Sequence, residues 1–176
     1  MDPYKSPAEQ NVDSYQSDKT ERKDLDGLGG WLILVGIGVV LSPIRLAILM
    51  LMTYPGIFLS DTWASLTTPG SEFYSPYWAP ILIGEIVVNG LQFVACLYLM
   101  YLYFGKKKAF PAVYIGLTLF VLAFIVVDAN VVKLVLPDEP IFDEDTIKEL
   151  TRSAVSALIW IPYMLVSERV KATFTR

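Results

Sequence analysis

Four long apolar blocks dominate this chain, and their length limits what it can fold into. They run from Gly27 to Tyr54, Trp78 to Phe104, Pro111 to Leu136 and Arg152 to Val166. A bilayer core about 30 Å thick needs about 20 mostly apolar helical residues to cross it. The first three blocks exceed that length, and the fourth reaches it if its helix begins in the preceding acidic stretch. The sequence therefore predicts a membrane protein.

Helices, rather than strands, are expected to make the crossings. Strands of a transmembrane barrel alternate apolar and polar residues over about 10 positions, whereas residues 94–104 and 117–127 are apolar at nearly every position. Closed barrels and helices are the two structures that satisfy their backbone groups inside a bilayer. We predict an all-α bundle of four transmembrane helices, spanning about residues 28–54, 78–104, 111–136 and 144–168.

Two segments outside the spans have a different composition. Residues 1–26 are acidic and lack aliphatic periodicity, so they cannot bury enough surface to offset chain entropy, and we expect a disordered tail. Residues 169–176 form a basic C-terminal tail. The Lys and Arg residues near the span ends lie in residues 19–23, 106–108 and 169–176, whereas the connections 55–77 and 137–151 hold only Lys148. Positive residues favour the cytoplasmic side, so we predict that both termini are cytoplasmic.

The residue types present exclude several classes of function. The chain has no histidine and a single cysteine, Cys96, which removes histidine-based catalysis and any intramolecular disulfide. No nucleotide-binding or metal-binding motif is present, so we expect no cofactor and no enzymatic activity. The basic residues form no dense patch interleaved with aromatic residues, so nucleic-acid binding is not expected.

Ionisable side chains within the spans are the strongest candidates for a functional site. Charges in a membrane cost about 2.5 to 3.5 kcal/mol each on insertion scales, so each needs a partner or a wet cavity. At about 1.5 Å per residue, all of them fall in the outer half of the bilayer, and we expect them to meet. Asn89 and Gln92 share one helical face with Glu85 and extend the set. The candidate polar cluster comprises Arg45, Glu85, Asn89, Gln92, Asp128, Lys133 and Arg152.

The polar cluster has three interpretations, which the sequence leaves open. Polar residues join transmembrane helices by hydrogen bonds and ion pairs, so the cluster can be purely structural. It can also line a pocket that opens outward to a solute, a lipid headgroup or a proton. The third interpretation is a contact surface for another membrane protein.

The C-terminal segment carries a second candidate site. Arg169 and Lys171 are placed to face anionic headgroups, while Phe174 is expected in the membrane interface. We therefore predict that Arg169, Lys171 and Phe174 dock on the membrane or on a partner.

Several short motifs resemble a known family. They are Gly29-Gly30-Trp31-Leu32, the turn from Lys106 to Pro111, the segment Ile159-Trp160-Ile161-Pro162-Tyr163, and the run from Ser167 to Phe174. With these motifs the chain resembles the DUF2569 proteins from about residue 27 to its C-terminus. The resemblance implies a small integral protein of the bacterial inner membrane, and it supplies no reaction, ligand or catalytic residue.

The function expected from these observations is that of a multi-pass inner-membrane protein serving as an accessory or interaction component. Its partners would be the lipid bilayer and either another membrane protein or a second copy of the chain. The alternative is a small transporter or a solute- or lipid-binding protein with a polar pocket in the outer half of the bilayer.

Overall fold

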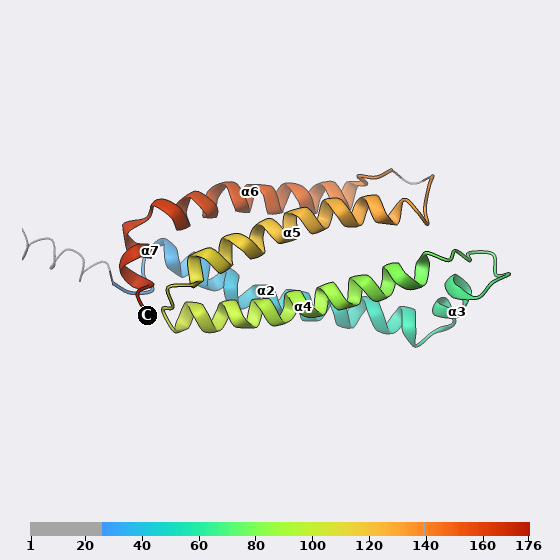
Figure 1. Cartoon of the computed structure of the whole chain (residues 1–176), viewed down its shortest axis with the longest axis horizontal. Helices are drawn as coiled ribbons and strands as arrows, with labels where there is room; N and C mark the ends of the chain where they lie inside the picture. Colours follow the sequence, from blue (N-terminus) through green and yellow to red (C-terminus); the bar gives the residue numbers. More distant parts are fainter. Residues whose placement is uncertain (1–25, 139) are drawn as a thin grey trace, which may run out of the picture.

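A computed structural model describes residues 26–138 and 140–176, and the described part contains helices and no strand. Four long helices lie side by side (Figure 1). They are α2 (Trp31–Phe58), α4 (Trp78–Phe104), α5 (Phe110–Val132) and α6 (Glu144–Val166), with the short helices α3 (Asp61–Thr67) and α7 (Glu168–Thr173). The helices α2, α4 and α5 are long and apolar enough to cross a membrane. The predicted all-helical membrane fold is confirmed to that extent.

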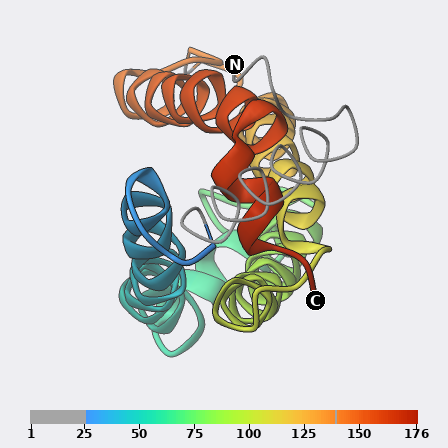
Figure 2. The same ribbon diagram turned by 90° about the vertical axis from the view of Figure 1, so that its left-hand side faces the viewer.

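Three adjacent helix pairs pack closely, in the order α2, α4, α5, α6 around the bundle. Figure 2 views this arrangement along the helices from the end that carries α7. We call that end the base, because the α4–α5 turn and both described chain ends also lie there. The opposite end carries α3 and the α5–α6 connection, and we call it the α3 end (Figure 1). The pairs α2–α4 and α5–α6 form two antiparallel helical hairpins.

The helix boundaries differ from the prediction at several ends, each for a local reason. The first helix begins at Trp31 instead of residue 28, because Gly30 has a φ of 57°, outside the right-handed helical region. It then continues through Pro55, and the backbone N–H of Leu59 donates to the Pro55 carbonyl. The predicted connection after this helix also contains α3, whose first turn is capped by the Ser60 side chain.

The third and fourth long helices end earlier than predicted. The helix α5 stops at Val132, four residues before the predicted end, and tight turns follow it. These turns lead toward Pro137, and a proline disfavours the helical conformation of the residue that precedes it. The helix α6 ends at Val166 because Ser167 adopts an extended conformation and caps α7. At its other end, Asp143 caps α6, and hydrogen bonds from the Thr146 side chain and backbone N–H lower the pKa of this carboxyl.

The predicted fourth span, α6, has polar first turns that contain Glu144, Asp145 and Lys148. It is therefore less apolar than the three helices that meet the length and composition of a membrane span. The predicted disordered tail lies outside the described residues except for Asp26, which forms an ion pair with Lys106 at 2.8 Å.

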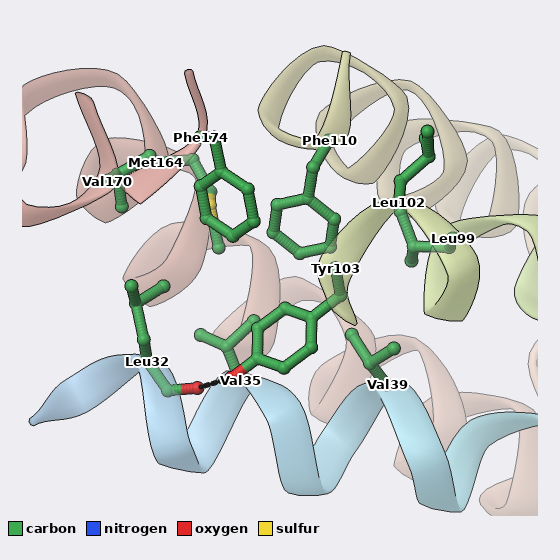
Figure 3. Packing of buried hydrophobic residues seen from close by; sticks show 10 residues of the cluster. All are labelled: Leu32, Val35, Val39, Leu99, Leu102, Tyr103, Phe110, Met164, Val170 and Phe174. Carbon is green, nitrogen blue, oxygen red and sulfur yellow. Dashed lines mark hydrogen bonds between the residues drawn. The ribbon is translucent and has the colours of Figure 1, made fainter. Parts of the chain in front are cut away.

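The buried core lies at the base and joins every long helix (Figure 3). Its centre is a group of three rings: Phe110 stacks on Phe174 with ring centroids 4.4 Å apart, and Tyr103 packs edge-on against Phe110. The Tyr103 hydroxyl donates a buried hydrogen bond of 2.7 Å to the Leu32 carbonyl. This bond ties α2 to α4, and the ring of Phe174, which packs on Tyr103 of α4 and Phe110 of α5, ties these two helices to the C-terminus. The buried members are Leu32, Val35, Val39, Leu99, Leu102, Tyr103, Phe110, Met164, Val170 and Phe174.

Backbone hydrogen bonds complete the base. The Thr173 hydroxyl accepts from the Gly27 N–H and donates to the Gly27 carbonyl, both at 3.1 Å. The Lys108 N–H donates to the Arg176 carbonyl at 2.7 Å, and the Arg176 N–H donates to the Lys106 carbonyl. The C-terminal segment is therefore bonded both to the start of the first hairpin and to the α4–α5 turn.

Gly36 is the position where this base tolerates least change. A Cβ atom there would lie 2.5 Å from the Tyr103 hydroxyl oxygen. We expect Gly36→Ala to lower the free energy of unfolding by about 1 to 3 kcal/mol, because the ring must move and its bond to Leu32 is strained. Thermal unfolding of the purified protein in detergent measures the change.

Gly38 provides the matched control for this experiment. It lies on the same helix, and an added Cβ atom meets nothing within 4 Å. We expect Gly38→Ala to leave the melting temperature unchanged or raise it, since Ala favours helix over Gly. Equal losses for both variants would show that the close approach of Tyr103 is not what makes Gly36 necessary.

Candidate functional site

A cavity of about 510 Å³ lies between α2, α4, α5 and α6. Its lining is divided by polarity along the bundle. Toward the base the lining is mostly apolar and includes Val35, Leu99, Leu117 and Trp160. From mid-height toward the α3 end it carries the polar and charged side chains Ser42, Arg45, Glu85, Asn89, Gln92, Asp128, Thr146, Glu149, Arg152, Ser153 and Ser156.

All members of the predicted polar cluster except Lys133 line this cavity. Lys133 follows the end of α5, and its ammonium group donates to the Pro137 carbonyl at 2.6 Å. Its predicted place inside a span is wrong, because the helix ends before it. The structure thus brings together residues from all four long helices, as the shared depth of the charges predicts.

The ion pairs differ from the expected ones. The shared depth of the charges predicts that Glu85 and Asp128 each lie within reach of Arg45, Lys133 or Arg152, whereas the ion pair that Arg45 forms is with Glu149 of α6, at 3.2 Å. Within residues 26–138 and 140–176, no ion pair includes Glu85, Asp128 or Arg152. In the described part of the chain, the two acids therefore form no direct ion pair with these bases.

Glu149 is the functional candidate that sequence reasoning missed. The predicted fourth helix, from about residue 144, already includes it, but the predicted polar cluster does not. The spacing of Glu149, Arg152, Ser156 and Trp160 is three, four and four residues, which places them on one helical face. That spacing is visible in the sequence, and with the predicted start of the helix at residue 144 it identifies Glu149 as a member of the same face.

One wall of the cavity is the polar face of α4. Glu85, Asn89, Gln92 and Cys96 all line it, in the order that their helical spacing implies. The Asn89 amide donates to the Tyr54 hydroxyl at 2.7 Å, which orients this side chain against α2. Asp128, on α5, lines the same cavity as Glu85. Two carboxyl groups in this relation favour a cationic group between them.

The C-terminal candidates lie elsewhere, at the base. Phe174 is only 5% exposed and stacks on Phe110, so its predicted place in the membrane interface is wrong: the core takes up its ring. Arg169 lies against Gly29 and Gly30 and is partly buried. Lys171 is exposed and pairs with Glu168 at 2.9 Å. The predicted basic tail is thus mainly a packed segment of the fold.

The Arg45–Glu149 pair can be tested by a double-mutant cycle. We expect Arg45→Gln and Glu149→Gln to couple by at least about 0.5 kcal/mol in the free energy of unfolding, because each substitution removes the same contact. As a control, Arg45→Gln combined with Lys106→Gln should be additive, since Lys106 lies at the base. Unfolding in detergent measures both cycles. Additivity of the first cycle would show that the pair does not join the two helices.

Comparison with known proteins gives one match. The family model described as "Protein of unknown function (DUF2569)" matches residues 25–175. No curated protein and no solved structure matches the chain. The matched range includes the six helices of the described residues, α2 to α7, and every cavity residue described above. The chain is therefore a member of the DUF2569 family, a membrane protein of unknown activity.

Proposed function

We propose that this protein binds a polar ligand inside the membrane, in the cavity between its two helical hairpins. The observation that carries the proposal is the set of charged side chains that face the cavity without an ion-pair partner in the described part of the chain: Glu85, Asp128 and Arg152. An intramembrane charge is costly unless a partner or water satisfies it. A ligand that meets these groups would supply the missing interactions.

The shape of the cavity favours binding from one side over a through-channel. The packed core of Leu32, Tyr103, Phe110 and Phe174 lies below it and fills the base. Charged groups occur from mid-height upward and do not continue toward the base. Ligand exchange by a small transporter would therefore need the core to open, whereas a binding protein needs no such change.

The orientation that we propose places the base in the cytoplasm of a bacterium and the α3 end outside its inner membrane. The Lys and Arg residues at 106–108 and 169–176 support it, because they lie at the base and favour the cytoplasmic side. In this orientation α6 is the fourth crossing, and its Glu149 and Arg152 face the cavity rather than the lipid. Both termini are then cytoplasmic.

The role of accessory component, expected from the sequence, stays a prediction, as does the absence of enzymatic activity. Co-purification from native membranes tests the accessory role through a stoichiometric partner protein.

The proposed orientation predicts which positions a membrane-impermeant maleimide reaches in intact cells. In a Cys96→Ser background, we expect cysteines at Ser65 and Asp143 to react, because both lie at the α3 end. A cysteine at Lys107 should react only after the cells are permeabilised. Mass shifts on a gel report the labelling. Reaction of the Lys107 variant in intact cells would invert the orientation.

The wet cavity predicts a second labelling pattern, on α4. In the same background, we expect Gln92→Cys to react with a small water-soluble thiol reagent, because its side chain lines the cavity. The matched control is Val94→Cys, two residues further along the same helix. The side chain of Val94 is 62% exposed and does not line the cavity, so in a membrane it faces lipid. It should not react. An unreactive Gln92→Cys in the folded protein would contradict the proposed pocket.

A further inference from the structure

The side of the bundle between α2 and α6 is its least closed side. The backbones of these two helices pack more weakly than those of the other adjacent pairs. Two side-chain contacts bridge them: the rings of Trp31 and Trp160 at the base, 6.5 Å apart, and the Arg45–Glu149 ion pair nearer the α3 end. We call the stretch between these bridges the α2–α6 seam.

Small side chains face the cavity along the seam. They are Gly38 and Ser42 on α2, and Ser153 and Ser156 on α6. A Cβ atom at Gly38 would meet nothing within 4 Å, so the space beside it is open. The Ser42 hydroxyl donates to the Gly38 carbonyl of its own helix and makes no bridge across the seam. The seam is therefore a side passage between the cavity and the surrounding bilayer.

The lining of the cavity suits a ligand with a polar head and an apolar tail. Along α4 it runs from Glu85 to Leu99, about 21 Å at about 1.5 Å per residue. That length exceeds the roughly 15 Å of hydrocarbon in one leaflet. A volume of about 510 Å³ accepts a headgroup and part of one chain, and the rest of the lipid can stay in the bilayer through the seam. A water-soluble solute would leave the apolar half of the cavity unused.

The charges that lack ion-pair partners specify the headgroup. Arg152 offers a guanidinium group, which matches the geometry of a phosphate. Glu85 and Asp128 offer carboxylates, which accept hydrogen bonds from an ammonium group. Because both signs of charge face one cavity, the complementary headgroup carries both charges.

We propose that the ligand is a zwitterionic amphiphile, with a phosphate and a primary ammonium group, that enters from the bilayer through the α2–α6 seam. The proposal rests on the proposed binding function and names its ligand class. The headgroup lies between Arg152 and the two carboxylates, and the tail lies along Leu117 and Trp160. The tail passes through the open stretch of the seam, whereas the headgroup enters at the level of the polar half of the cavity, where the Arg45–Glu149 contact must part for it to pass.

The test uses the full chain in vesicles that contain phosphatidylethanolamine with a photoreactive group on its acyl chain. After irradiation, mass spectrometry should find adducts at Leu117 and Trp160, inside the cavity. Adducts at Leu158, which is 76% exposed on the outer face, measure ordinary contact with the bilayer. Excess unlabelled phosphatidylethanolamine should remove the cavity adducts. Adducts confined to the outer face of the folded protein would overturn the proposal.

Two variants test the headgroup site. We expect Arg152→Gln to lower the cavity adducts several-fold relative to Leu158, while Lys133→Gln, whose side chain lies near the same end but outside the cavity, leaves them unchanged. A probe with a phosphatidylglycerol headgroup should give fewer cavity adducts, because it has no ammonium group. A probe with a trimethylammonium headgroup should also give fewer, because that group donates no hydrogen bond. Equal adducts with all three probes would overturn the headgroup assignment.

A tether tests the route. In the Cys96→Ser background, Arg45→Cys and Glu149→Cys are joined by a short bifunctional thiol reagent that reduction cleaves. Joining them before the probe is added should abolish the cavity adducts and keep those at Leu158, and reduction should restore them. Undiminished cavity adducts in the joined protein would overturn entrance through the seam.

The labelling of Gln92→Cys separates this proposal from the function on which it rests. If that cysteine reacts with the water-soluble reagent and no lipid adduct forms inside, the cavity is open to water but takes up no lipid, and only the present inference is wrong. If the cysteine does not react and no adduct forms, the binding function is wrong as well.

Discussion

The rest of this structure depends on the packing of three aromatic rings at the base. Phe174 of the C-terminus stacks on Phe110 of α5, and Tyr103 of α4 packs on both and bonds to α2 through the Leu32 carbonyl. Apolar burial gives little drive for association between helices inside lipid, because the surrounding chains are equally apolar, so close packing and hydrogen bonds decide how helices meet. Here those contacts are concentrated at one end of the bundle.

A bundle joined at its base leaves room higher up. Above the core the two hairpins enclose a cavity, and each of the four long helices contributes at least one charged side chain to its lining. The Arg45–Glu149 pair is the ionic contact between α2 and α6 in the described part of the chain. Removing the packed base would free the hairpins, and the polar residues would then lose the arrangement that collects them. The candidate site is therefore a consequence of where the core lies.

The structure also changes the meaning of the C-terminal motif. From its sequence, the segment after Ser167 has the charge and apolar spacing of a membrane-surface helix. In the fold, Val170 and Phe174 face the core, and the Thr173 hydroxyl bonds to the backbone of Gly27. A short amphipathic helix has the same pattern whether its apolar face meets lipid or protein. Only the neighbouring helices decide between the two.

By itself, the sequence determined the helical class, the polar face of α4 and three of the four predicted spans, those that correspond to α2, α4 and α5. Long apolar runs and helical spacing are local properties, which follow from bilayer thickness and from 3.6 residues per turn. Counting residues from the ends of the predicted spans also placed the charged residues at similar depths in the membrane. Lys133 is the exception, because it follows a helix end that the sequence did not reveal. Ion pairing was decided by tertiary structure: Arg45 reaches Glu149 because α6 lies opposite α2 across the seam, and the rotation of each helix leaves Glu85, Asp128 and Arg152 facing the cavity. Depth along one helix limits which groups can meet, but the relative rotation and tilt of neighbouring helices decide which of them do.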